Sequence, residues 1–435
     1  MKIRTFVFTF CAIVWSVTTD ARPVRLPFDT LAAHWQQYIG QEVEISTPLC
    51  ISGIFYDSLL LAPERLMVPE QYADGLEKGD STRFRELEQH NVARSARLCT
   101  RFYGYKLQHG NTIRGLRAKV TAERQLLSAR TPSFRAQRRL DRLPDLGDAT
   151  VRLCMANIQN YFADLGGYAG AKTPEEFERQ TTKIAKGLLY LNADIYALCE
   201  IERGPKTVSI LVDAMNRMAH AKGRYAWVDL GFTDGDTISC GYIYRTDRVQ
   251  PYGTPQFAVH DPSSHYHYRF VACGFRELAS GESMVLNINH LRSKRGTPQR
   301  SDSIRMDNVD SLLHMIRRYE EARIFDDPDV LLVGDWNCYR RERPIRYLVS
   351  QGYQDVLERF DPDGYSYVYR GTSGYLDQAF ATPSMMAQIT AAHPVHLCAD
   401  YYYSLGYKRG SDLTRHRYSD HDPVLIGIRL RSAAR

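Results

Sequence analysis

Six apolar, strand-like runs in this sequence each end in a polar residue suited to binding a metal ion or a phosphate, and this recurrence limits the fold more than any other feature. A buried strand gains nothing from a carboxylate at its end, and several carboxylates brought together would repel one another. Shared binding of a hard divalent cation, which takes oxygen ligands, makes such a gathering favourable. We therefore expect the runs to be neighbouring strands whose ends meet at one site. The polar endings are Asn157, Glu200, His290, Asp335 with Asn337, Asp377, and Asp420 with His421.

From residue 149 onward, expected strands alternate with expected helices along the chain, which is typical of an α/β fold. Thr173 to Glu176 is a capping box with proline at the first helical position, and it predicts a helix that runs to about residue 191. Further helices are expected at 208–219 and 302–321. The expected strands are 151–156, 195–199, 239–244, 268–275, 284–288, 330–333 and 424–430.

Several of these endings carry the oxygen atoms that a metal-assisted hydrolysis needs. Asn157, Glu200 and Asp420 are candidate ligands for Mg²⁺, with Mn²⁺ or Ca²⁺ as alternatives. Asp335 is the candidate that orients or deprotonates an attacking water. The pattern therefore indicates hydrolysis of a phosphodiester.

The remaining endings offer hydrogen-bond donors for the oxygens of a phosphate. Asn337, His290 and His421 are the candidate donors. A histidine in this role works best as imidazolium, which a neighbouring carboxylate favours by opposite charge. We expect Asp377 to be that partner of His421. Taken singly, a histidine is more often a surface or core residue with a structural role, and Asp420 or Asp422 alone could cap a turn before Pro423.

The polar endings lie in six longer motifs, which are NIQNYF (157–162), LNADIYALCEIE (191–202), LNINHLRSK (286–294), VLLVGDWNCY (330–339), SGYLDQAFAT (373–382) and YSDHDPVLIG (418–427). In this order, they resemble the motifs of the endonuclease/exonuclease/phosphatase superfamily, which is deoxyribonuclease I-like, and most closely those of its bacterial secreted extracellular nucleases. The resemblance covers about residues 145–432 and implies a four-layer α/β/β/α sandwich with the site at the strand ends. Shorter matches to the secreted subgroup include YSYVYRG (365–371).

The resemblance also implies a role for each candidate residue. It makes Glu200 the main metal ligand, with the side chains of Asn157 and Asp420 beside the ion. Asp335 and Asn337 match a pair that orients water. His290 and His421 match histidines that contact the phosphate, and Asp377 matches the carboxylate that supports His421. The chain departs from the subgroup at Arg203 and Cys338, and neither departure removes a candidate catalytic group.

The segment before residue 145 differs in its sequence pattern, because it consists of short β-like runs separated by turns. Residues 22–127 are expected to form a small all-β, OB-like domain, residues 128–147 a linker, and residues 148–435 the catalytic domain. The chain carries 56 Lys and Arg against 50 Asp and Glu, a net charge of +6. From Arg83 to Arg142 there are fifteen basic and four acidic residues, a stripe typical of proteins that meet polyanions. A basic front segment of this kind is expected to raise the local concentration of nucleic acid, with binding that weakens as salt rises.

The N-terminal pattern predicts a secretory signal peptide over residues 1–21. Lys2 and Arg4 precede an apolar run that is too short to span a bilayer, and small residues follow it up to Ala21. We expect export to the medium, the periplasm or the cell surface, with no transmembrane segment after cleavage; a retained N-terminal anchor is the alternative. Eight cysteines remain, and their pairing cannot be derived from their spacing.

The sequence therefore predicts a secreted, metal-dependent, sequence-nonspecific endonuclease that acts on DNA, with RNA as an alternative polymer. No stable protein partner is indicated. A sphingomyelinase-like or other phosphoester phosphatase would use the same site, and an exposed apolar hairpin would favour the lipid enzyme. A surface protein that binds nucleic acid through a decayed site is a third hypothesis, against which the complete set of polar endings argues.

Overall fold

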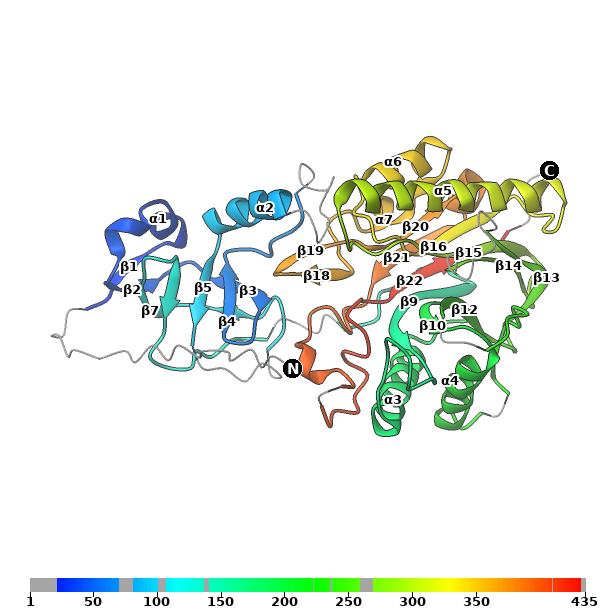
Figure 1. Ribbon diagram of the computed structural model, residues 1–435, viewed down its shortest axis with the longest axis horizontal. Helices are drawn as coiled ribbons and strands as arrows, with labels where there is room; N and C mark the ends of the chain where they lie inside the picture. The colour runs from blue at the N-terminus through cyan, green and yellow to red at the C-terminus, as the bar shows by residue number, and fades with distance from the viewer. Residues whose placement is uncertain are drawn as a thin grey trace, which may run out of the picture.

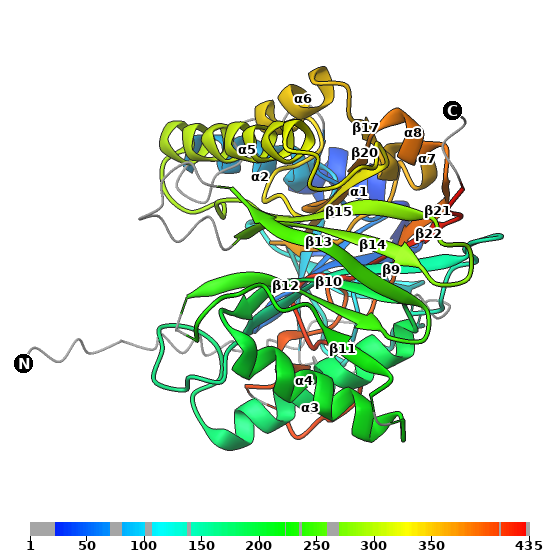
Figure 2. The ribbon, with the colours of Figure 1, turned by 90° about the vertical axis from the view of Figure 1, so that its right-hand side faces the viewer.

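Two six-stranded β sheets stacked face to face form the larger part of the molecule (Figures 1 and 2). The computed structural model describes residues 22–69, 81–100, 107–136, 141–221, 223–234, 237–258, 269–408 and 410–431, so the predicted signal peptide lies outside it. The first sheet consists, in spatial order, of β11 (Tyr225–Trp227), β12 (Ile238–Arg245), β10 (Ile195–Glu202), β9 (Val151–Tyr161), β22 (Val424–Ile428) and β21 (Ile389–Pro394). The second consists of β13 (Val249–Phe257), β14 (Phe270–Glu277), β15 (Ser283–His290), β16 (Val330–Asp335), β20 (Asp377–Ala381) and β17 (Gln354–Asp355).

Helices cover the outer face of each sheet. Apolar side chains between the sheets make a central core. A second core joins the first sheet to α3 (Pro174–Leu191) and α4 (Pro205–Met218), and a third joins the second sheet to α5 (Pro298–Glu321) and α6 (Arg343–Ser350). Figure 2 shows the helix, sheet, sheet and helix layers in turn. The predicted four-layer α/β/β/α sandwich is confirmed; strands buried on both faces explain the continuous apolar runs of the sequence.

The N-terminal residues form a separate small barrel beside the sandwich (Figure 1). Strands β7 (Leu116–Val120), β8 (Gln125–Leu127), β5 (Ala96–Cys99) and β4 (Ser58–Ala62) are neighbours in this spatial order, with β5 and β8 parallel. Both β7 and β4 also pair with one continuous segment, residues 42–54, so the sheet closes on itself. Such closure is expected of an OB-like module. The strands are β1 (Val24–Leu26), β2 (Glu42–Ile45), β3 (Leu49–Ile54), β4 (Ser58–Ala62), β5 (Ala96–Cys99), β6 (Thr112–Ile113), β7 (Leu116–Val120) and β8 (Gln125–Leu127).

This N-terminal part is not purely β, contrary to the expectation. It also contains the helices α1 (Phe28–Ala33) and α2 (Ser81–Ala93). In α1, Phe28 and Leu31 are buried in the barrel core. In α2, Leu87 instead packs with side chains of the sandwich. A helix as short as α1 has too few turns to give a periodic signal in the sequence.

The expected elements of the sandwich are present, and most are longer than expected. The strand expected at 268–275 is found at Phe270–Glu277, and the strand expected at 424–430 ends earlier, at Ile428. The capping box begins α3 as predicted, because the Thr173 side chain accepts a hydrogen bond from the backbone N–H of Glu176 at 3.2 Å. Strand β13 is not expected from the sequence, because Pro251, Gly253 and Pro255 are poor strand formers; it lies at the edge of its sheet. The short helices α7 (Val356–Phe360) and α8 (Pro383–Met386) are not expected either.

In the part of the chain that the structure describes, no helix combines the length and apolar character needed to cross a membrane. Among the cysteines that the structure describes, Cys154 and Cys199 are free thiols and are buried as small apolar side chains.

Candidate active site

The polar residues at the strand ends lie together at one end of the sandwich, where the two sheets face each other. In the second sheet, strand register places His290 beside Asp335 and Asp335 beside Asp377. In the first sheet, Asn157 of β9 lies next to the β10 residue that precedes Glu200. The side-chain amide of Asn157 donates to Asp335 Oδ2 at 3.1 Å and so connects the two sheets.

Asp335 lies at the centre of this group and is almost completely buried, with 2% of its surface exposed. Its Oδ1 accepts the backbone N–H of Asn337 at 2.9 Å, and Oδ2 accepts the Asn157 amide, so the carboxyl plane is fixed. Burial raises the pKa of Asp335 to about 7, and the nearby charges of Asp377 and Glu200 act in the same direction, while His421 opposes them. A carboxyl group that titrates near neutrality is suited to accept a proton from water.

His421 and Asp377 form a buried pair. His421 Nδ1 lies 2.8 Å from Asp377 Oδ2, and its Nε2 lies 4.0 Å from Asp335 Oδ2. Burial alone would lower the pKa of His421, but the carboxylates of Asp377 and Asp335 outweigh it and hold the pKa well above its ordinary value. The imidazole is therefore cationic at neutral pH, with Nε2 directed towards the centre of the group.

A β bulge sets the direction of Glu200. The register of β10 against both β9 and β12 shifts between Cys199 and Ile201, and Glu200 has a left-handed φ of 64°. Cys199 packs between the sheets while Ile201 packs under the helices, so Glu200 is the extra residue. Its Oε2 accepts the backbone N–H of Asn160 at 2.9 Å. Burial, then the charge of Asp420, raises the pKa of Glu200.

His290 differs from His421 in its charge. Its Nε2 lies 3.8 Å from Glu200 Oε1 and 3.7 Å from Asp335 Oδ2. Burial and the positive charges of Arg269 and His421 hold the pKa of His290 well below its ordinary value. A neutral imidazole can bind a metal ion or donate one N–H.

Asn337 and Asp420 complete the predicted set. Asn337 has φ 48°, and its side-chain amide donates to the backbone carbonyl of Leu291 at 3.2 Å, which fixes the direction of the amide. Asp420 is half-buried and precedes His421, close enough for its charge to act on Glu200. All eight predicted residues thus lie in or beside one group.

The group has the chemistry of a divalent-cation site. Glu200, His290 and Asp335 each offer one ligand atom, and these atoms lie within 4.8 Å of one another; Asp335, Asp377 and His421 do the same. The mutual repulsion of the carboxylates is what a bound cation would relieve. The two sets share Asp335. The predicted ligands are Asn157, Glu200 and Asp420; the sets add possible ligands from the second sheet, namely His290, Asp335 and Asp377.

The sequence analysis did not single out two neighbours of the His421–Asp377 pair. The ring of Tyr367 lies against the imidazole of His421, with centroids 4.6 Å apart. The hydroxyl of Ser366 accepts the backbone N–H of Asp377 at 3.0 Å. Both residues belong to the YSYVYRG match, but nothing in that motif indicates the contact.

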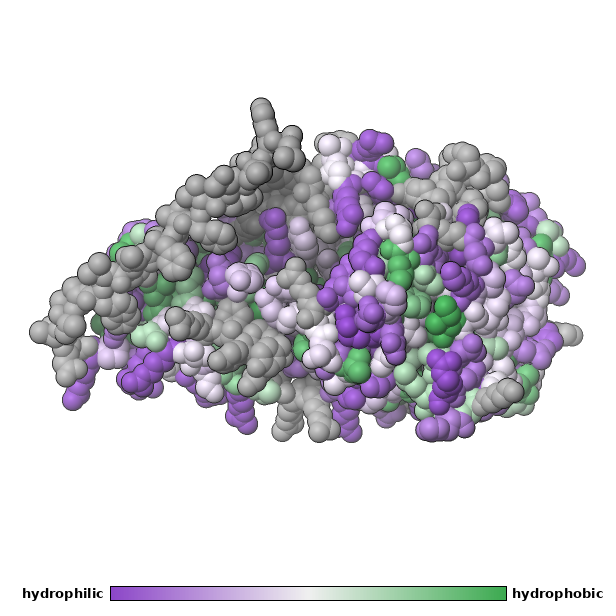
Figure 3. All heavy atoms as spheres, turned by 60° about the horizontal axis from the view of Figure 1, so that its bottom comes forward, coloured by the Kyte–Doolittle hydropathy of each residue, from purple (hydrophilic) through white to green (hydrophobic). Residues whose placement is uncertain are grey.

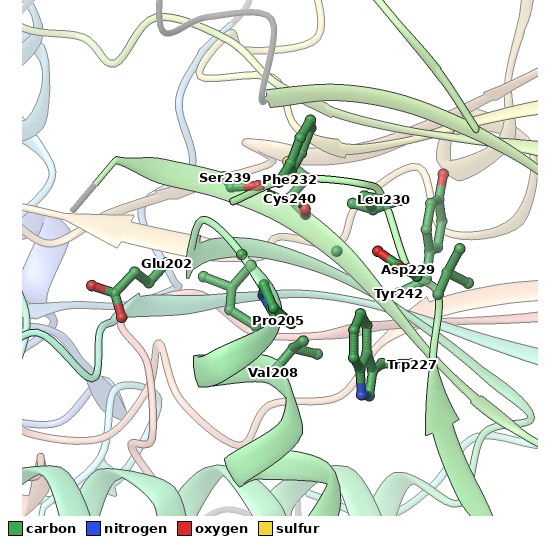
Figure 4. Close-up of a pocket in the computed structure, with 14 residues that line it drawn as sticks. Glu202, Pro205, Val208, Trp227, Asp229, Leu230, Phe232, Ser239, Cys240 and Tyr242 are labelled. Carbon is green, nitrogen blue, oxygen red and sulfur yellow. Dashed lines mark hydrogen bonds between the residues drawn. The ribbon is translucent and has the colours of Figure 1, made fainter. Parts of the chain in front are cut away.

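A separate hollow lies on the first sheet near the start of α4, lined by Pro205, Val208, Trp227, Phe232 and Tyr242 among others (Figure 4). Figure 4 shows that the carboxylate of Glu202, on its border, points away from it. That carboxylate accepts the backbone N–H of Ala163 at 2.7 Å and the hydroxyl of Thr207. None of the eight predicted residues lines this hollow.

Comparison with known proteins gives structural matches only. No family model matches the sequence, and no curated protein sequence matches it. An endonuclease/exonuclease/phosphatase from Bacteroides vulgatus aligns at 15% identity and a TM-score of 0.44 over 65% of this chain and 99% of its own. A mannosyl-6-phosphatase from Bacteroides thetaiotaomicron aligns at 15% identity and a TM-score of 0.44, over 64% of this chain and 100% of its own. An AP endonuclease from Archaeoglobus fulgidus aligns at 13% identity and a TM-score of 0.43, over 64% of this chain and 100% of its own.

Proposed function

We propose that this protein is a metal-dependent phosphodiesterase, exported by its N-terminal signal, that cleaves DNA internally and without sequence preference, with RNA as an alternative polymer. One observation carries the proposal: a carboxyl group with a pKa near neutrality, Asp335, lies 4.0 Å from a histidine held in its cationic form, His421. A proton acceptor and a positive donor side by side suit attack of water on a phosphate.

In this proposal Asp335 orients the water and accepts its proton. The Asn157 and Asn337 hydrogen bonds fix the Asp335 carboxyl, so little reorganisation is needed. His421 donates Nε2–H to a phosphate oxygen as negative charge develops, and Asp377 keeps it cationic.

Glu200, Asn157 and Asp420 are proposed to hold Mg²⁺, with Mn²⁺ or Ca²⁺ as alternatives. A cation bound there supplies Lewis-acid stabilisation of the phosphate. His290, kept neutral, and the side-chain amide of Asn337 are proposed to contact the phosphate from the second sheet.

The surface favours a nucleic acid over a lipid. Among the residues that the structure describes, the large apolar side chains that are exposed are spread over distant elements, for example Tyr56, Tyr168, Leu278 and Val349. On the face shown in Figure 3 the hydrophobic side chains of the sandwich form small, separate patches among hydrophilic ones. A sphingomyelinase-like enzyme needs a continuous apolar surface to enter a membrane interface.

The test is hydrolysis of circular plasmid DNA by purified residues 22–435 with Mg²⁺ or Mn²⁺. We expect nicking that EDTA abolishes and that Asp335→Asn reduces at least about 100-fold. Asp310→Asn is the matched control, because Asp310 is an exposed carboxylate on α5 and should leave the rate unchanged. Folded wild-type protein that leaves the plasmid intact would contradict the proposal and direct the search to sphingomyelin and phosphate monoesters.

A further inference from the structure

A short hairpin lies between the barrel and the sandwich (Figure 1). It consists of β18 (Tyr367–Tyr369) and β19 (Thr372–Gly374), paired with each other and with neither large sheet. Hairpins of this size are marginally stable by themselves. The conformation of this one therefore depends on what contacts its two sides.

The barrel holds one side of the hairpin through its backbone. The hydroxyl of Ser52, on β3, donates to the carbonyl of Gly371 at 2.8 Å. The backbone N–H of Ser373 donates to Leu66 O at 2.8 Å, and the N–H of Val68 donates to Ser373 O at 2.9 Å. These bonds are buried, since Ser52 and Ser373 have no exposed surface.

Helix α2 adds two contacts on the same side. The side-chain amide of Asn91 donates to the hydroxyl of Thr372 at 3.0 Å, and both residues are buried. Leu87 packs in a small apolar cluster with Leu376, and Tyr367 packs against that cluster. The barrel and the hairpin are thus joined by polar and apolar contacts together.

The other side of the hairpin holds both members of the His421–Asp377 pair. Ser366, at its base, accepts the backbone N–H groups of Leu376 and Asp377 through its hydroxyl, at 3.2 and 3.0 Å. Its carbonyl accepts the N–H of Asp422 at 2.8 Å. Tyr367 forms a backbone bridge with His421 besides the ring contact.

We propose that the barrel, acting through this hairpin, positions the His421–Asp377 pair, so that the barrel sets the turnover rate of the enzyme. Ser52 and Asn91 fix the hairpin, and Ser366 and Tyr367 fix the pair; all four are positioning residues. The part of this inference that concerns rate rests on the phosphodiesterase function proposed above. A barrel that served only to collect nucleic acid would act on KM and its salt dependence instead.

Ser52→Ala is the variant that tests the link from the barrel. It removes the bond to Gly371 and also the acceptor for the N–H of Leu66, which lies 3.0 Å away. Ser58→Ala is the matched control: Ser58 is a buried barrel serine with two side-chain hydrogen bonds, to Asp57 and from Arg97, and neither reaches the hairpin.

Two measurements are made on both variants at a temperature where each is folded. We expect Ser52→Ala to lower kcat on plasmid DNA about tenfold with KM within about twofold of wild type, because small displacements of catalytic groups cost rate. Ser58→Ala should retain kcat. Amide hydrogen exchange at Asp377 and Asp422 should accelerate in Ser52→Ala and not in Ser58→Ala.

The outcomes separate this inference from the proposed function. Wild-type protein without phosphodiesterase activity contradicts the function, while faster exchange in Ser52→Ala alone still supports the positioning of the pair by the barrel. Exchange that is unchanged in Ser52→Ala overturns the inference, as does a rise in KM with kcat intact. Tyr367→Phe, which keeps the ring against His421, should retain most of the turnover that Tyr367→Ala loses.

Discussion

At the scale of single residues, the candidate site depends on groups whose charge is set by their neighbours. Asp377 holds His421 as a cation at a distance of 2.8 Å, while His290, which has no such bond, is held neutral by burial. Two histidines in one site thus have different proton states for a local reason. The state of His421 follows from Asp377 rather than from its place in the sequence.

This dependence gives a prediction about coupling. Asp377→Asn should lower kcat about 100-fold, because His421 loses the charge that keeps it protonated. Asp377 acts through His421, so the double variant Asp377→Asn/His421→Ala should be no slower than His421→Ala alone. Steady-state kcat values of the wild type, the two single variants and the double variant form a double-mutant cycle. If the fold losses in kcat of the single variants multiply in the double variant, Asp377 acts independently of His421.

At the scale of elements, the ends of the strands carry the deviations that direct the catalytic side chains. Glu200 is the extra residue of a β bulge, and Asn337 has a left-handed backbone just beyond β16. Between β15 and β16 the backbones approach closely at Gly334, which has φ 147°. A β carbon there would lie 1.8 Å from the backbone oxygen of Asn289, so only glycine fits directly before Asp335.

Replacement of this glycine should therefore damage both stability and site. Gly334→Ala is expected to destabilise the fold by about 3 kcal/mol or more and to displace Asp335. Gly241→Ala is the matched control, because Gly241 is a buried glycine of β12 with ordinary space around its β carbon, 3.6 Å from Ile201. Thermal unfolding of the two variants measures their stability. An equal loss of stability in Gly334→Ala and Gly241→Ala would contradict the steric argument.

At the scale of the whole molecule, a buried ion pair joins the barrel to the sandwich. Arg65 donates to both oxygens of Asp400, at 2.9 and 3.3 Å, and Asp400 also accepts the hydroxyl of Tyr365 at 2.8 Å. Burial alone would raise the pKa of Asp400, but the charges of Arg65 and His396 outweigh it and lower the pKa. Removal of one member would leave a buried charge without its partner.

The contribution of the Arg65–Asp400 pair to the free energy of unfolding depends on pH with a definite sign. Since the pKa of Asp400 is lower in the folded protein, its contribution to stability is complete above the unfolded value of about 4 and disappears as pH falls through the folded value. Arg65→Met should destabilise the protein by roughly 3 kcal/mol at pH 7, and its difference from wild type should shrink as pH falls below the unfolded pKa of Asp400. Arg65→Met/Asp400→Asn should recover part of the loss. Melting temperatures across this range measure the effect, and a difference that is constant with pH would contradict it.

Much of this protein could be predicted from its sequence because the signals are local. Apolar runs mark strands that are buried on both faces, and the capping box at Thr173 marks the start of α3. The polar endings, Asn157 to His421, identify the residues that converge, since buried strands have no other use for them. The edge strand β13 escaped prediction, because its proline and glycine residues contradict the ordinary strand pattern.

The tertiary structure alone decided how those residues act on one another. The different charges of His290 and His421, and the pKa of Asp335 near 7, follow from burial and from carboxylates contributed by other strands. The contact of Tyr367 with His421, and of Ser52 with the hairpin, joins residues that are far apart in the chain. Sequence pattern fixes what each segment can form locally, whereas these properties depend on distances between segments, which only the packed molecule sets.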